Sequence, residues 1–206
     1  MWRDEVVEKS WTTLQRLRGE FSFTLIGGWA VYLYTKALKS RDIDIIVDHS
    51  VLMRLKESYD LRKNDRLKKY EFISDRVEVD TYVPYYSSLG IPAEEIQNKA
   101  LSLSGFSVPT PEHLLVTKQK AEIDRTGSEK GMKDRIDIIA LLLQADLDMG
   151  AYRRILAEYN LEGYLERLRS VVSDARSEFN MLGYTDFRRF KLQKRKLLGR
   201  IDATRD

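Results

Sequence analysis

The stretch FTLIGGWAVYLYTKALKSRDIDIIVD, Phe23 to Asp48, decides the fold of this chain. An apolar run ends at two glycines, a mostly apolar helical segment follows, and the β-branched run at 43–47 predicts a buried strand. Asp42 and Asp44 lie within this otherwise apolar context. Because residues two apart on a strand point to the same face, we expect both carboxylates on one face and the adjoining isoleucines in a core.

Two neighbouring carboxylates repel each other, and burying them is costly unless a cation compensates. Mg²⁺ prefers oxygen ligands and suits such a pair. A second alternating segment, Val77–Val83, places Asp80 on its polar face. If this strand pairs with the strand at 43–47, Asp80 joins Asp42 and Asp44, and three carboxylates can hold two metal ions about 3.5–4 Å apart.

Gly27 and Gly28 lie where the first strand ends and a helix begins. Glycine permits close approach to the backbone, and the N–H groups of a helix N-terminus favour an anion. We therefore expect these two glycines to bind phosphate.

The composition sets the class of protein. The chain has 206 residues and a net charge of +3, which suits one domain with an appendage or two small domains. Residues 151–206 carry 13 basic and 8 acidic side chains, so the C-terminal quarter is the basic part. Cysteine is absent, which excludes disulfides and cysteine-based sites. We see no signal peptide and no apolar run of membrane-spanning length, and we expect a cytoplasmic protein.

Periodicity predicts an α/β (α+β) fold, with a small mixed β-sheet core flanked by helices and a helical C-terminal region. We divide the chain into a core at 1–108 and a helical region at 109–206. The predicted strands are 21–26, 43–47, 70–74 and 76–83. The predicted helices are 5–18, 29–38, 51–59, 93–99, 111–124, 132–146, 150–159, 161–179 and 184–200.

The pattern resembles the signature of the DNA polymerase β-like nucleotidyltransferase superfamily. Ile26-Gly27-Gly28 is followed after thirteen residues by Asp42-Ile43-Asp44-Ile45, and Asp80 matches the third carboxylate on a later strand. The resemblance implies that Asp42, Asp44 and Asp80 are catalytic and hold Mg²⁺ or Mn²⁺. It also implies an NTP substrate whose phosphates contact Gly27 and Gly28, with help from Ser40.

Two later segments, 111–118 and 133–138, look like motifs of the AbiEii/AbiGii-type branch, which includes toxins of abortive-infection and toxin–antitoxin systems. This resemblance implies that Lys118 steadies the triphosphate and that an antitoxin is a partner. Lys118 emerges from an apolar helix stripe, so it needs an anionic partner. Asp134 and Asp137 are either helix-start charges or residues that order Lys118. Relatives often carry an arginine where this chain has Leu38.

The preferred interpretation is a metal-dependent nucleotidyltransferase that moves an NMP to a hydroxyl of tRNA or another RNA, a protein, or a small molecule. One alternative is an inactive nucleotide-binding module that acts through a partner. Another is an RNA-binding toxin that uses the basic run at 187–196, although that run also suits a solvated helix face. His49 and His113 belong to no cluster, and we interpret both as structural.

Overall fold

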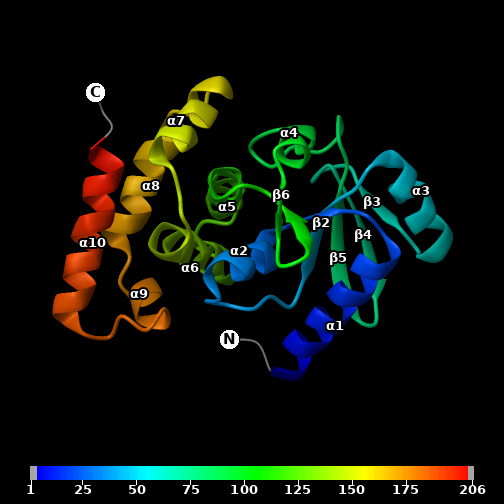
Figure 1. Cartoon of the computed structure of the whole chain (residues 1–206), viewed down its shortest axis with the longest axis horizontal. Coiled ribbons are helices and arrows are strands. Elements are labelled where there is room, and N and C mark those ends of the chain that lie inside the picture. The colour runs from blue at the N-terminus through cyan, green and yellow to red at the C-terminus, as the bar shows by residue number, and fades with distance from the viewer. Residues whose placement is uncertain (1–3, 204–206) are drawn as a thin grey trace. The chain divides into compact units, whose positions relative to one another are not determined.

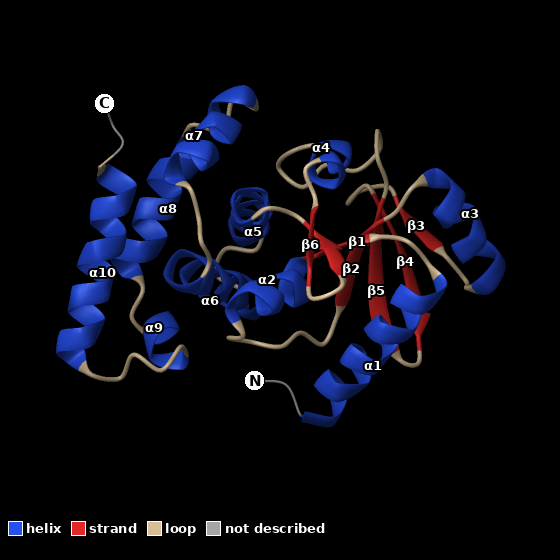
Figure 2. Cartoon of the chain, viewed as in Figure 1, coloured by secondary structure: helices blue, strands red, loops and turns tan. Residues whose placement is uncertain are grey.

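The structure is a computed structural model that describes residues 4–203. The chain divides into two compact units, Met1–Thr110 and Pro111–Asp206. The first contains all the described strands and the second contains only helices among its described residues (Figures 1 and 2). The predicted mixed α/β fold with a helical C-terminal region is confirmed.

The first unit is built on a seven-stranded mixed sheet with strand order β3-β4-β5-β2-β1-β7-β6. Three of its strands were not predicted, namely β3, β6 and β7. They are three residues long, and unlike the equally short but fully buried β1 each contains exposed residues, so no continuous apolar run marks them. The strands are β1 (Thr24–Ile26), β2 (Ile43–Ile46), β3 (Arg62–Asn64), β4 (Lys69–Ser74), β5 (Val77–Tyr82), β6 (Leu101–Leu103) and β7 (Phe106–Val108).

The centre of the sheet confirms the predicted facing of β2. Ile43 and Ile45 are completely or almost completely buried, whereas Asp44 between them is partly exposed. β2 pairs with β1 in antiparallel and with β5 in parallel orientation. The strand that carries Asp80 therefore lies directly beside the strand that carries Asp44.

Four helices complete the described part of the first unit: α1 (Asp4–Glu20), α2 (Gly27–Thr35), α3 (His49–Ser58) and α4 (Ala93–Asn98). α2 begins at Gly27, two residues before the predicted start, because Gly27 starts the first turn with a φ of +65° and Gly28 is buried within that turn. α1 packs on α2 through Trp11 and Trp29, whose ring centroids lie 4.9 Å apart.

Six helices make up the described part of the second unit. They are α5 (Pro111–Asp124), α6 (Glu129–Gln144), α7 (Met149–Glu158), α8 (Gly163–Asp174), α9 (Ser177–Met181) and α10 (Phe187–Asp202). The single helix predicted at 161–179 is wrong. The chain leaves helical geometry at Ala175, which is extended, and α9 follows as a separate short helix.

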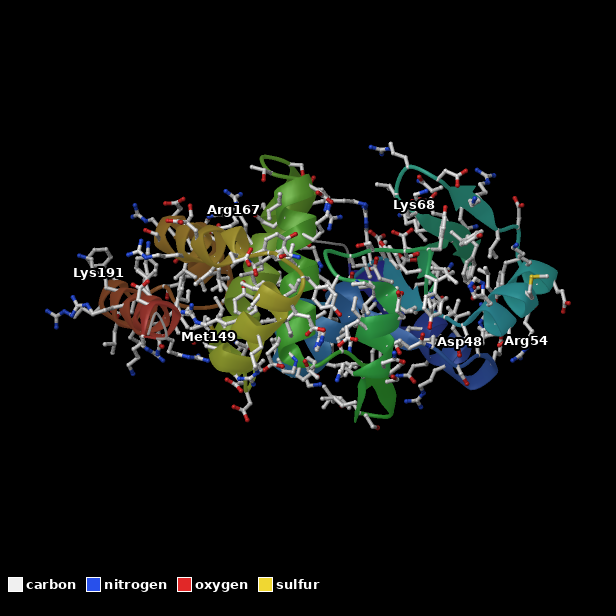
Figure 3. All side chains as sticks on the ribbon, turned by 90° about the horizontal axis from the view of Figure 1, so that it is seen from above. Asp48, Arg54, Lys68, Met149, Arg167 and Lys191 are labelled. Atoms are coloured by element: carbon white, nitrogen blue, oxygen red, sulfur yellow. The ribbon has the colours of Figure 1, made fainter. Side chains whose placement is uncertain are left out.

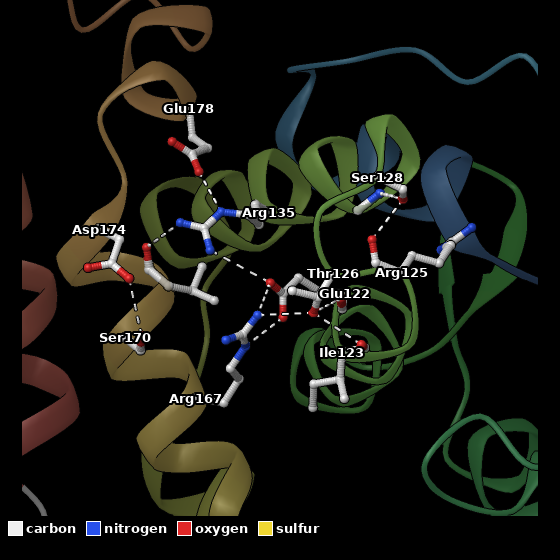
Figure 4. A network of polar contacts seen from close by, with 12 residues as sticks. Glu122, Ile123, Arg125, Thr126, Ser128, Arg135, Arg167, Ser170, Asp174 and Glu178 are labelled. Carbon is white, nitrogen blue, oxygen red and sulfur yellow. Dashed lines mark hydrogen bonds and ion pairs between the residues drawn. The ribbon is translucent and has the colours of Figure 1, made fainter.

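A buried charge network joins helices of the second unit (Figure 4). Glu122 on α5 accepts two hydrogen bonds from Arg167 on α8, at 2.5 and 2.8 Å. Arg135 on α6 lies 3.6 Å from Glu122 and donates to Glu178 on α9 at 2.6 Å. Because each buried carboxylate has an arginine partner, the network holds these helices together without leaving a charge unpaired.

Lys68 in the first unit and Lys191 in the second are both exposed (Figure 3). Within residues 4–203, no helix is both long enough and apolar enough to span a bilayer.

Candidate active site

Asp44 lies at the centre of the sheet, where β2 runs between β1 and β5. Its Cα partners are Ile26 on β1 and Asp80 on β5. Gly27 follows Ile26 with a φ of +65°, and a Cβ added there would lie only 2.1 Å from Asp44 Oδ2. Only glycine therefore lets the carboxylate lie against the first turn of α2. The carboxylate therefore lies close to the partial positive charge of that helix N-terminus.

Asp80 stands beside Asp44 on the neighbouring parallel strand, as the alternation of 77–83 predicted. Burial and the adjacent Asp44 carboxylate together raise the pKa of Asp80 from 3.8 to about 6, although Lys69 acts in the opposite direction. Negative charge at this position is therefore disfavoured despite the nearby ammonium group.

Lys69, the first residue of β4, contacts Asp80 directly. Its Nζ lies 2.5 Å from Asp80 Oδ2 and 3.0 Å from Glu71 Oε1. Only 8% of Lys69 is exposed. Burial alone would lower the pKa of Lys69, but Asp80 and Glu71 outweigh burial and raise it above its usual value. The side chain is therefore a buried cation on the third predicted carboxylate.

Asp42 and Ser40 lie in the segment between α2 and β2. Asp42 just precedes β2 and pairs with its neighbour Arg41, whose Nε lies 3.1 Å from Asp42 Oδ1. Ser40 is only 5% exposed. Arg41 thus brings a guanidinium group to the first aspartate, although the position four residues before that aspartate is Leu38.

The donor chemistry of this region fits a hard cation. Asp44 and Asp80 are adjacent carboxylates, and the charge of Asp44 makes the ionised state of Asp80 less favourable. Oxygen ligands of this kind suit Mg²⁺ or Mn²⁺. As the side chains stand, however, no three or more Asp, Glu, His or Cys residues within 4–203 are grouped so that they could hold a metal ion.

Lys118 lies in the second unit, where its ammonium group is paired with aspartates of α6. Its Nζ is 2.6 Å from Asp137 Oδ2 and 3.2 Å from Asp134 Oδ1, and all three side chains are at most 7% exposed. Burial disfavours the Asp137 carboxylate, but Lys118 and Lys133 outweigh burial and hold its pKa below the usual value. Asp134 and Asp137 lie well inside α6, so they order Lys118 and are not helix-start charges.

Sequence reasoning missed Lys69 and Arg41 as partners of the predicted carboxylates. Lys69 ends a charged stretch that resembles a loop. The signal that could have identified it is the tight turn at 75–76, which pairs Ser74 with Val77 and therefore Glu71 with Asp80. Lys69, two residues before Glu71, then falls on the face that carries Asp80.

Comparison with known proteins gives matches at the level of structure. No model of a protein family matches the sequence, and no curated protein matches it either. The crystal structure of JHP933 from Helicobacter pylori is 12% identical over 98% of this chain and 96% of that chain, with a TM-score of 0.53. That of a putative nucleotidyltransferase from H. pylori is 12% identical over 100% of both chains, with a TM-score of 0.52.

A third solved structure is an antigenic nucleotidyltransferase-like protein from Paracoccidioides brasiliensis. It is 20% identical over 68% of this chain and 76% of that chain, with a TM-score of 0.40. The two H. pylori structures show that this chain shares its fold with a protein described as a putative nucleotidyltransferase.

Proposed function

We propose that this chain is a metal-dependent nucleotidyltransferase that moves a nucleoside monophosphate from an NTP to an acceptor hydroxyl. The observation that carries the proposal is the position of Asp44. Its carboxylate lies against Gly27 at the start of α2 and beside Asp80 on the adjacent strand. A carboxylate pair next to a helix N-terminus is suited to a metal–triphosphate complex.

In this proposal, Asp42 and Asp44 hold Mg²⁺ or Mn²⁺, and Asp80 adjoins them. When bound, the metal lowers the pKa of the acceptor hydroxyl and stabilises charge at the α-phosphate. Gly27 and Gly28 present backbone N–H groups of α2 to the β- and γ-phosphates. The acceptor hydroxyl loses its proton to solvent as its oxygen forms a bond to the α-phosphorus, the bond to the pyrophosphate oxygen breaks, and pyrophosphate leaves.

The finer assignments are part of the same proposal. The acceptor is a hydroxyl of tRNA or another RNA, of a protein, or of a small molecule. The chain acts as a toxin of the AbiEii type and has an antitoxin partner. Its resemblance to that branch in 111–118 and 133–138 supports this assignment. Lys118, although predicted to steady the triphosphate, has Asp134 and Asp137 as direct partners.

The test is incubation of the purified chain with each α-³²P-labelled NTP and Mg²⁺ or Mn²⁺, with and without total RNA, followed by gel electrophoresis. We expect label on RNA or protein with wild type and none with Asp42→Ala. If wild type labels neither RNA nor protein, the incubation is repeated with small-molecule acceptors and analysed by thin-layer chromatography. Absence of transfer to all three acceptor classes would contradict the proposal.

One observation favours a second candidate, an inactive nucleotide-binding module that acts through a partner. Asp42 and Asp80 each have a basic partner within the chain, Arg41 and Lys69 respectively. This candidate predicts nucleotide binding by calorimetry without transfer, and binding that Asp44→Asn leaves largely unchanged.

A further inference from the structure

We infer that Lys69 supplies the positive charge at Asp80 that a second metal ion would otherwise supply, so that the site loads one divalent cation per chain. The inference rests on the proposed function, because it concerns the carboxylates that would hold the metal. It differs from the sequence-based expectation, in which three carboxylates hold two ions.

The first observation that supports this inference is the position of the Lys69 ammonium group. Lys69 Nζ lies 2.5 Å from Asp80 Oδ2, which is hydrogen-bond distance to one oxygen of the carboxylate that would otherwise face a second metal ion. A divalent ion held by the same carboxylate would lie close to the ammonium group, and the two positive charges would repel each other. Lys69 and a second metal ion therefore compete for the same carboxylate.

The sheet register fixes Lys69 in this place. Glu71 on β4 is the direct partner of Asp80 on β5, and Lys69 lies two residues earlier on the same face. Glu71 Oε1 accepts from Lys69 at 3.0 Å and also from Asn64 Nδ2 at 3.0 Å. Two carboxylates thus hold the ammonium group, and one of them is itself anchored to β3.

Burial makes the ion pair between Lys69 and Asp80 costly to separate. The side chain of Lys69 is 10% exposed and that of Asp80 is 27% exposed. Separating a largely buried ion pair leaves uncompensated charge on both partners, so a metal ion would have to overcome that cost to enter at Asp80.

The experiment is Mn²⁺ binding to the full chain, measured by equilibrium dialysis and by electron paramagnetic resonance, in which two adjacent Mn²⁺ ions give a spin-coupled signal. We expect one uncoupled ion per chain in wild type. Lys69→Met should bind two ions and give the coupled signal. Lys68→Met is the matched control, since it removes the same charge from the adjacent, exposed residue, and it should bind one ion like wild type.

Asp80→Asn keeps the test valid if Lys69→Met fails to fold. With Lys69 in place, Asp80 contributes no metal ligand, so the variant should still bind one ion. Two coupled ions in wild type, or a loss of one ion in Asp80→Asn, would overturn the inference while leaving the proposed function intact. No Mn²⁺ bound by wild type would instead overturn the proposed metal site, and the inference with it.

Discussion

Each unit of this protein contains a buried lysine that contacts two carboxylates, and the charge around the two lysines differs. Lys69 in the first unit contacts Asp80 and Glu71, with Asp44 on the adjacent strand. Lys118 in the second unit contacts Asp134 and Asp137, which also lie near Arg125 and Lys133. Carboxylates surround the first lysine, whereas further basic side chains surround the second cluster.

The difference appears in the pKa values of the aspartates. Burial and Asp44 raise the pKa of Asp80 to about 6. Burial also acts on Asp137, but Lys118 and Lys133 prevail and its pKa falls below the usual value. The second cluster is therefore balanced by its own side chains, as a structural ion pair is. The first cluster favours additional positive charge, as expected of a site that binds a metal–nucleotide complex.

The largest expected effect is that of Asp44→Asn on nucleotidyl transfer. The amide keeps the shape of the side chain but removes the charge that would hold the metal, so we expect transfer of labelled NMP to fall about 1000-fold. Circular dichroism should show an unchanged fold. Glu78→Gln removes an exposed carboxylate from β5 and should retain full activity. Equal activity of Asp44→Asn and wild type would rule out the active-site assignment.

Lys118→Met tests whether the lysine–aspartate cluster of the second unit stabilises the fold. It leaves two buried aspartates without their shared ammonium group, so we expect a loss of about 3–5 kcal/mol in the free energy of unfolding. Urea denaturation measures this loss. Lys120→Met removes the exposed pair with Asp124 on the same helix and should cost less than about 0.5 kcal/mol. Similar losses for both variants would mean that burial of Lys118 contributes nothing.

Gly27→Ala sharpens the account of the first site. A methyl group at this φ of +65° would meet the Asp44 carboxylate, so we expect a loss of about 1–3 kcal/mol in stability together with reduced transfer. Gly127→Ala is the matched control, because Gly127 has a φ of +81° and no atom within 4 Å of an added Cβ. Gly127→Ala should lose only the stability that backbone strain at a positive φ costs, and its nucleotidyl transfer should be unchanged. Unimpaired transfer by Gly27→Ala would contradict the close approach of Asp44.

The pH dependence of stability tests the raised pKa of Asp80 directly. Because the folded state raises the pKa of Asp80 from 3.8 to about 6, it holds this proton more tightly than the unfolded state does. Asp80 therefore lowers stability as pH rises from about 4 to 6, by at most about 1.4 kcal/mol per pH unit. Urea denaturation across this range should show a steeper fall for wild type than for Asp80→Asn.

Asp137 changes the stability with pH in the direction opposite to that of Asp80. Its folded pKa is lowered, so its stabilisation is complete above the unfolded pKa of an aspartate, about 4, and is lost as pH falls further. Asp137→Asn should remove part of the acid destabilisation below pH 4. Parallel pH profiles for wild type and both variants would contradict the assigned pKa directions.

The sequence predicts the parts of the fold whose signal is local. Alternation at 77–83 and the isoleucines at 43 and 45 indicate the facing of β5 and β2, and Thr110-Pro111-Glu112 correctly marks the start of α5. The role of Lys69 depends on the pairing of β4 with β5 around the turn at 75–76, which has to be followed from Glu71 to Lys69 before the contact with Asp80 becomes visible. The contact between Gly27 and Asp44 likewise joins residues seventeen positions apart. Gly27 was predicted to bind phosphate, and in the structure its close neighbour is the carboxylate of Asp44.

The most direct test of the comparison is the effect of Mg²⁺ on unfolding of wild type, Asp44→Asn and Asp137→Asn, measured by urea denaturation with and without the metal. Mg²⁺ at ten times its dissociation constant should stabilise wild type by about 1.4 kcal/mol. We predict the same gain for Asp137→Asn, whose change lies in the balanced cluster, and no gain for Asp44→Asn. Equal stabilisation of Asp44→Asn and wild type by Mg²⁺ would contradict the assignment of the metal to the first unit's carboxylates.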